Sequence, residues 1–312
     1  MQVRDRVGRR VKLQDLNVLM TVVQAGSMLK AAERLNTGQP NISRAINELE
    51  RAVGVRLLDR HRRGVEPTAY GRALLDGGMI AFDGLRQAVR NIEFLADPST
   101  GEVRIGCTPL LASSFVSAVV DRLFQHHPRI TFSLMTGYVE TLHRELTERN
   151  VDFLITRRFG SLADDRLGFE LLFNDAAVVA TGAQSPWTRR RRIALGELAN
   201  EPWVLPPPES GVGSIAAEAF RAIALDYPRT AVVTDSPHAR MSLLATGRFV
   251  TIFPASALRF SSHPEIKVLP VELPTVVVPN GIVTLRNRTL SPVAHLFIAH
   301  AREVAKSMAK RQ

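Results

Sequence analysis

Residues 31–71 read AAERLNTGQPNISRAINELERAVGVRLLDRHRRGVEPTAYG. The stretch predicts a helix from Pro40 to Val53, whose apolar stripe is Ile42, Ala45, Ile46, Leu49 and Val53. At about 100° per residue, the opposite face carries Pro40, Arg44, Asn47 and Arg51. Pro40 suits the first turn of a helix, where its missing N–H is no loss, and Gly54 ends the helix.

Two shorter helices are predicted before this one. The first carries Leu16, Leu19, Met20 and Val23 and stops at Gly26; the second begins at the N-cap Ser27 and carries Met28, Ala31, Ala32 and Leu35. Asn36–Gly38 has the residues of a tight turn. A short turn followed by a helix with a basic outer face is typical of a helix-turn-helix, whose second helix enters the major groove of DNA. An ordinary three-helix core with a solvated face is the alternative.

Two short strands are predicted after the third helix. Val55–Asp59 and Val65–Thr68 flank the basic turn His61–Gly64, which is the pattern of the wing in a winged helix. Arg62 and Arg63 in this turn can reach phosphates or a minor groove.

Charge is concentrated in this N-terminal part of the 312-residue chain. Residues 1–72 hold 14 Lys and Arg against 7 Asp and Glu, whereas residues 73–312 hold 26 against 23. A small basic module on a near-neutral body is typical of a protein that binds the phosphate backbone of DNA and has a separate second domain; a basic solubilising surface is the alternative.

No apolar run approaches the roughly 18 residues of a membrane span. With no apolar signal segment in residues 1–10 and a single cysteine, Cys107, we expect a cytoplasmic protein without disulfides.

A long helix is predicted from Ala69 to Ala96, because this stretch lacks proline and carries apolar residues throughout. Its glycines weaken it as an isolated helix, so we expect it to pack in a coiled-coil dimer contact. Asp97–Gly101 then interrupts the helical pattern and is the predicted domain boundary.

Strands and helices alternate beyond the boundary. Strands are predicted at 102–107, 129–135, 152–156, 173–181, 202–205, 231–235, 251–253 and 281–285; helices are predicted at 110–126, 139–149, 214–224, 237–246 and 292–308. Repeated β-α-β units imply a parallel sheet with helices on both faces.

The N-terminal stretch resembles the LysR-type transcriptional regulators. The residues that carry the resemblance are Gly26-Ser27, Ala31-Ala32, Leu35, Gln39-Pro40, Ser43-Arg44, Leu49-Glu50, Gly54–Leu58, Arg60, Thr68 and Gly71, and GEVRIG at 101–106 is similar to the start of that family's effector domain. The resemblance is close over about the first seventy residues and mainly architectural beyond them. One departure is Gly38, where the family usually has Ser, so we expect Thr37 or Gln39 to cap the third helix.

The resemblance implies an α+β chain in two parts. A winged helix-turn-helix domain covers residues 11–68, with its motif at about 28–47, and a linker and dimerisation helix covers 69–96. An α/β effector domain like a type 2 periplasmic binding protein covers 101–309, with lobe I at about 101–170 and 275–309 and lobe II at about 171–274. It also implies a homotetramer built from linker-helix dimers and a co-inducer between the lobes. The expected partners are double-stranded promoter DNA, a small-molecule effector and, for an activator, RNA polymerase, with no membrane. The alternative is a solute-binding or catalytic α/β protein fused to a nonspecific basic module.

Motifs for enzyme chemistry are weak, and we expect no catalytic residue, cofactor or metal. Gly211–Ala216 fits G-x-G-x-x-A, but residues 206–210 separate it from the preceding strand, unlike a dinucleotide-binding turn. The adjacent His126 and His127 cannot both ligate one metal from a helix face. Cys107 is expected to be a small apolar residue at a strand end, with a reactive thiol as the alternative.

Ligands of open α/β sheets bind beyond the carboxyl ends of strands and at the starts of the following helices. This rule selects as effector-binding residues Thr108, Tyr138, Thr156, Arg157, Ser210, Gly213, Ser214 and Ser236. Helix starts and the Arg157 guanidinium favour an anionic effector. The predicted DNA-binding residues are Ser27, Thr37, Gln39, Pro40, Asn41, Ser43, Arg44, Asn47, Arg51, Arg60, Arg62, Arg63 and Thr68.

We predict that replacing both Arg62 and Arg63 by alanine weakens binding to all DNA sequences alike, because both side chains act on phosphates. In a salt titration of DNA binding, the dependence of log K on log salt should flatten by about one unit for each lost contact. A double variant that lost discrimination between sequences but kept its salt slope would show that the wing reads bases.

Overall fold

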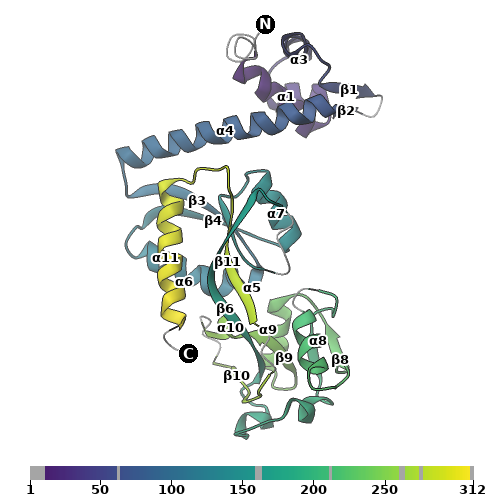
Figure 1. The fold of residues 1–312 in the computed structure, drawn as a ribbon, viewed down its shortest axis with the longest axis vertical. Coiled ribbons are helices and arrows are strands. Elements are labelled where there is room, and N and C mark those ends of the chain that lie inside the picture. Colours follow the sequence, from purple (N-terminus) through teal and green to yellow (C-terminus); the bar gives the residue numbers. More distant parts are fainter. Residues whose placement is uncertain are drawn as a thin grey trace. The chain divides into compact units, whose positions relative to one another are not determined.

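The computed structural model describes residues 11–61, 64–158, 164–210, 213–259, 264–273 and 277–309. The chain forms two compact units, Met1–Val89 and Arg90–Gln312, which we describe separately (Figure 1).

The described part of the first unit holds three short helices, a two-stranded sheet and most of the long helix α4 (Ala69–Ala96). The short helices are α1 (Leu13–Ala25), α2 (Met28–Arg34) and α3 (Gln39–Val53), and the strands are β1 (Leu58–His61) and β2 (Gly64–Pro67). Gly26 and Gly54 end α1 and α3 in the left-handed conformation, with φ of 64° and 81°, as glycine does at a helix C-terminus. The predicted apolar stripe of α3 packs inward, with Ile42, Ile46 and Leu49 buried against the other helices.

Two local predictions in this unit are wrong. Gly38 is the N-cap of α3 and makes no side-chain cap, so neither Thr37 nor Gln39 takes over that role. The first wing strand begins at Leu58 rather than Val55, because the Glu50 carboxylate of α3 accepts the backbone N–H of Leu57 at 2.8 Å and thereby holds the chain against the helix. His61 pairs with Gly64 across the wing, and Arg62 and Arg63 lie outside the described residues.

The predicted long helix forms as α4 (Ala69–Ala96). Within the first unit, Gly78 lies close to α1, where an added Cβ would meet Leu16 and Met20 at 3.8 Å. Large apolar side chains are exposed along α4: Tyr70, Ile80, Leu85, Val89, Ile92 and Leu95.

The second unit contains a nine-stranded mixed sheet. Its strands are β3 (Thr100–Cys107), β4 (Arg129–Thr136), β5 (Phe153–Arg157), β6 (Leu167–Gly182), β7 (Trp203–Leu205), β8 (Thr230–Val233), β9 (Val250–Pro254), β10 (Ile266–Val268) and β11 (Val277–Leu285). Their order is β4-β3-β5-β11-β6-β9-β7-β8, with β10 beside β6. The expected parallel pairing holds for β3 with β4 and β5 and for β7 with β8 and β9. It is wrong for β6 and β11, because these long strands cross between the two halves and pair antiparallel with each other, with β5 and with β9.

The two largest hydrophobic clusters of this unit lie in two lobes. Lobe I comprises β3, β4 and β5 with α6 (Ser117–Phe124), α7 (Val139–Thr147) and α11 (Pro292–Ala309). Its core contains Phe115, Phe153 and Phe297. Lobe II comprises β7 to β10 with η3 (Pro186–Arg189), η4 (Leu195–Leu198), α8 (Gly213–Arg221) and α9 (Pro237–Ala245), and its core contains Trp203 and Phe220. The short α10 (Ala255–Arg259) follows β9.

The prediction of one regular helix over 110–126 is wrong. It is divided into α5 (Pro109–Leu111), the π-helical η2 (Ala112–Val116) and α6. Ser114 Oγ donates to the carbonyl of Leu110 and Ser117 Oγ to that of Ala112, each at 2.6 Å. Hydroxyls that bond to helix carbonyls in this way disturb the regular ladder.

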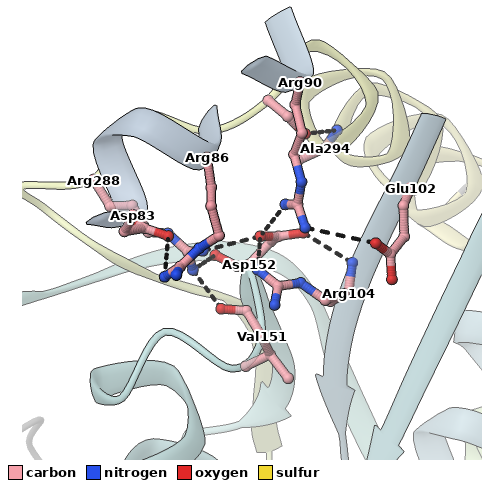
Figure 2. Close-up of polar contacts among 10 residues, drawn as sticks. Asp83, Arg86, Arg90, Glu102, Arg104, Val151, Asp152, Arg288 and Ala294 are labelled. Atoms are coloured by element: carbon pink, nitrogen blue, oxygen red, sulfur yellow. Dashed lines mark hydrogen bonds and ion pairs between the residues drawn. The ribbon is translucent and has the colours of Figure 1, made fainter. Parts of the chain in front are cut away.

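Asp152, between α7 and β5, has a fully buried side chain surrounded by three arginines (Figure 2). Its Oδ1 accepts from Arg288 at 3.0 Å, from Arg90 at 3.2 Å and from the Arg104 guanidinium at 3.4 Å. Its Oδ2 accepts from the backbone N–H of Arg104 at 2.9 Å. Arg288 also donates to the carbonyl of Val151. One carboxylate thus joins the end of α4, strand β3 and the segment before α11.

We predict that Asp152→Asn lowers the free energy of unfolding by about 3 kcal/mol, because the buried Arg288 charge loses its carboxylate. Chemical denaturation of the full chain measures the change. The matched control is Glu303→Gln, which removes the ion pair between Glu303 and Lys306. The side chains of these two residues are 52% and 71% exposed, so this substitution should have little effect on the free energy of unfolding. An unchanged denaturation midpoint for Asp152→Asn would show that the backbone carbonyls of Val151 and Asp152 are sufficient to hold the Arg288 guanidinium.

Candidate DNA-binding surface and effector cleft

A groove of about 490 Å³ lies where the starts of α2 and α3 meet the wing. It brings together four predicted DNA-binding residues: Ser27, Gln39, Ser43 and Arg60. Lys30 and His61 also line it and were not predicted. Lys30 lies three residues after Ser27, so a projection of the second helix would have identified it.

The outer face of α3 continues from this groove. Pro40, Asn41, Arg44, Asn47 and Arg51 are exposed there, on the side away from the buried stripe. Arg60 Nη2 donates to Asn47 Oδ1 at 3.1 Å, which fixes the wing arginine beside the helix. A second hollow, of about 450 Å³, is lined by Asn47, Arg51 and Arg56 near the end of α3. Exposed amides, hydroxyls and guanidiniums on one helix are the groups that read base edges and phosphates.

Thr37 and Thr68, which were also predicted to bind DNA, make hydrogen bonds within this unit. Thr37 Oγ1 accepts from Asn41 Nδ2 at 3.1 Å. Thr68 Oγ1 donates to the carbonyl of Arg56 at 2.8 Å and accepts from the N–H of Gly71 at 3.0 Å, so its hydroxyl stabilises the start of α4.

The predicted effector residues lie at strand ends and helix starts of the second unit. Thr108, Tyr138 and Ser236 are the N-caps of α5, α7 and α9. Tyr138 is exposed, and its hydroxyl donates to the carboxylate of Asp235, so this contact joins lobe I to lobe II. The hydrogen bond to Asp235 raises the pKa of Tyr138.

Helix starts were expected to favour an anionic effector, but the N–H groups of Gly213 and Ser214 at the start of α8 are already hydrogen-bonded within the chain. Ser210 Oγ accepts the N–H of Gly213 at 3.0 Å and donates to the carbonyl of Pro207 at 2.7 Å. The N–H of Ser214 donates to the carbonyl of Ser210 at 2.9 Å. Gly211 and Val212 lie outside the described residues. Ser210 therefore provides the hydrogen-bond acceptors for the N–H groups of Gly213 and Ser214 at the start of α8.

Arg157 at the end of β5 is the cationic residue in the wall of a small cavity between the lobes. The cavity has a volume of about 10 Å³, and its walls include Asp175 of β6, Ile215 of α8 and Ile252 of β9. The Arg157 side chain is buried, and its Nε and Nη2 have no hydrogen-bond partner among the described residues. Burial lowers the pKa of Arg157, and the charge of Asp175 opposes this shift. Thr156, also buried, precedes it on the strand.

The sequence reasoning missed two buried polar residues near this cavity. Arg240 of α9 donates from Nη1 to the carbonyl of Ile252 at 3.2 Å, and its guanidinium lies 4.4 Å from the ring centre of Phe253. Asn280 of β11 pairs with Arg157 across the sheet, and its Oδ1 has no partner within the described part of the chain. Arg240 could have been selected from the sequence as a charged residue within the otherwise largely apolar start of α9. Nothing in the sequence around Asn280 indicates that its side chain is buried.

The Cys107 thiol is fully buried at the end of β3, and burial raises its pKa to about 12. Burial therefore favours the protonated thiol, which supports the expectation of a small apolar residue at a strand end. The described residues contain no group of three or more acidic, histidine or cysteine side chains arranged to hold a metal.

Comparison with known proteins accounts for both units. Residues 13–72 match the family model described as "Bacterial regulatory helix-turn-helix protein, lysR family", and residues 96–306 match "LysR substrate binding domain". The chain belongs to the LysR family.

Among curated relatives of this LysR-family chain, the transcriptional regulator GbpR of Azospirillum brasilense is 27% identical, over 97% of this chain and 89% of that protein. A full-length OxyR variant from Pseudomonas aeruginosa is 19% identical with a TM-score of 0.65, covering 95% of each chain. CbnR in complex with its target DNA is 21% identical with a TM-score of 0.64, covering 94% of this chain and 100% of that one. At these identities the two solved structures show the fold alone.

The LysR-family chain is a DNA-binding transcriptional regulator with an effector-binding domain, and not an enzyme. The alternative of a solute-binding or catalytic protein with a nonspecific basic module is therefore wrong. No helix within the described residues is both long and apolar enough to span a membrane.

We predict that Arg44→Ala weakens binding to the specific DNA site by about 1–3 kcal/mol, as expected for a side chain that contacts a base edge. Titration against a selected site and against competitor DNA separates this loss from a general one. Arg221→Ala, which removes an exposed arginine from α8, is the charge-matched control and should bind DNA like the wild type. Unchanged specific affinity in a folded Arg44→Ala protein would place Arg44 outside the interface.

Proposed function

We propose that this regulator binds promoter DNA as a homodimer or homotetramer and responds to a small anionic effector held between the lobes of its effector domain. The observation that carries the effector assignment is the buried Arg157 guanidinium, whose two open donors lie at the cavity between the lobes. A carboxylate or a similar acid group is the natural partner of such a fork. The protein acts in the cytoplasm, where it reaches chromosomal DNA and, as an activator, RNA polymerase.

The assembly assignment rests on α4. Its exposed apolar side chains include Ile80, Leu85, Val89 and Ile92, and Leu95 is 81% exposed. Exposed apolar residues along a 28-residue helix are what a helix–helix contact between subunits buries. The proposed boundaries are residues 11–68 for the DNA-binding domain, 69–96 for this helix and 101–309 for the effector domain. DNA recognition is proposed for the α3 face and the wing, by analogy with the structure of CbnR in complex with its target DNA.

An effector can change transcription only if two arrangements of the oligomer differ in affinity for it, with typical couplings of about 1–3 kcal/mol. We expect the footprint length or the DNA bend to change with the effector, while the contacts of α3 remain the same. Footprinting of the full chain on a selected DNA site, with and without a stabilising compound, measures this change.

We predict that a compound with an acid group raises the melting temperature of the wild type more than that of the Arg157→Ala, Thr108→Val variant. Binding to the folded state stabilises it by mass action. The measurement is a thermal shift against carboxylates, aromatic acids and sugars. If no compound stabilises the wild type more than the variant, the assignment of the cleft is overturned.

A further inference from the structure

Four consecutive arginines, Arg189–Arg192, lie on the surface of lobe II, at the end of η3 and before η4. All four are exposed. Neither the DNA-binding surface described above nor the proposed effector site includes any of them. Like charges that are adjacent in the chain repel one another and attract anions, so this segment is a candidate contact for a polyanion.

Both ends of the segment are fixed to the core of lobe II. Trp187 packs against this core before the arginines, and Ile193, only 2% exposed, belongs to it directly after them. The N–H of Arg190 donates to the carbonyl of Trp187 at 3.1 Å, and the N–H of Ile193 donates to that of Pro270 at 3.2 Å. Because the backbone is already held in place, binding to this segment costs little additional backbone entropy.

Two of the four arginines have partners within lobe II. Arg190 donates to the carboxylate of Glu197 at 2.7 Å, and its guanidinium lies 5.9 Å from the ring centre of Trp187. Arg192 lies 3.8 Å from the carboxylate of Glu272, and these side chains are 85% and 88% exposed. The charges of both arginines are therefore balanced by carboxylates of the chain itself.

The other two arginines are open. The side chains of Arg189 and Arg191 make no hydrogen bond or ion pair within the described part of the chain. An external anion can pair with them without displacing a carboxylate of lobe II. A guanidinium presents a planar fork of N–H donors that matches the oxygens of a phosphate group.

The segment offers charge without an apolar anchor. Among the described residues, no large apolar side chain is exposed between Leu171 and Ile223. Interfaces with proteins are centred on apolar and aromatic side chains, whereas binding to the DNA backbone depends mainly on neutralisation of phosphates. The surface therefore fits the phosphates of DNA better than an acidic protein surface.

We propose that Arg189 and Arg191 form a second DNA contact of this regulator, on lobe II, which binds the phosphate backbone and reads no base sequence. The contact is separate from the α3 face, the wing and the proposed effector site. Because the same chain already binds DNA, a second contact on it benefits from a high effective concentration, so two arginines suffice to add affinity. The contact strengthens binding without changing which site is selected.

The test variant is the full chain with Arg189→Gln and Arg191→Gln. It is titrated at several salt concentrations against a long duplex that carries a selected site with extended flanks, and against competitor DNA. The affinity for both DNAs should fall alike, by about threefold or more at low salt. The dependence of log K on log salt should flatten by about one unit for each lost contact.

The matched control is the double variant Arg122→Gln, Arg144→Gln. It removes the same charge from two exposed arginines on α6 and α7 of lobe I, and it should bind DNA like the wild type. A control that lost as much affinity as the test variant would overturn the contact, because net charge alone would then explain the loss.

A gain of binding provides a second measurement that misfolding cannot imitate. Glu272→Gln removes the carboxylate beside Arg192 and releases a third arginine of the segment. This variant should bind the long duplex more tightly than the wild type, with a steeper salt dependence. If the Arg189→Gln, Arg191→Gln variant keeps the wild-type affinity and salt slope, the DNA contact is wrong and an acidic protein surface becomes the partner to test.

Discussion

The buried carboxylate of Asp152 is the contact on which the construction of lobe I depends. Arg90, Arg104 and Arg288 reach it from three different elements, and the fully buried Arg288 guanidinium could not leave water at this place without it. The backbone N–H of Arg104 bonds to the same carboxylate, so the register of β3 beside the start of β5 is fixed as well. A single negative charge thus determines where the end of α4 and the segment before α11 meet the sheet.

Strand β5 relates this cluster to the cleft. Asp152 immediately precedes the strand and Arg157 is its last residue, and all five residues of β5 are buried. The strand lies between β3 and β11, in the interior of the sheet. A buried element in a close-packed sheet moves as one body, so its two ends are mechanically linked. At one end the buried charges are matched by hydrogen bonds, which makes a structural cluster. At the other end, Nε and Nη2 of Arg157 have no partner among the described residues, and we propose that an effector binds there.

The sequence predicted the DNA-binding unit well because its information is local. The stripe of Ile42, Ile46 and Leu49 and the stops at Gly26 and Gly54 follow from helical spacing and glycine chemistry within a few residues. The start of the wing was misplaced because it depends on Glu50, whose carboxylate bonds seven residues ahead. In the effector domain the strand positions were predictable. The antiparallel crossing of β6 and β11 was not, because it joins residues about a hundred positions apart.

The residues proposed for the cleft show the same limit of prediction from sequence, because some of them are identified only by contacts between distant parts of the chain. Arg157 and Tyr138 were selected by a rule about strand ends, and their role in effector binding stays a prediction. Arg240 and Asn280 became candidates only through their burial without partners, which depends on the packing of both lobes. Open donors raise the free energy of the ligand-free closed form, and an acid group offsets that cost when it binds. At the proposed site, the stability of the effector domain and its affinity for an anion are therefore linked quantities. The exposed residues of the α3 face differ, because they are solvated in the free protein and leave no buried donor open while they wait for DNA.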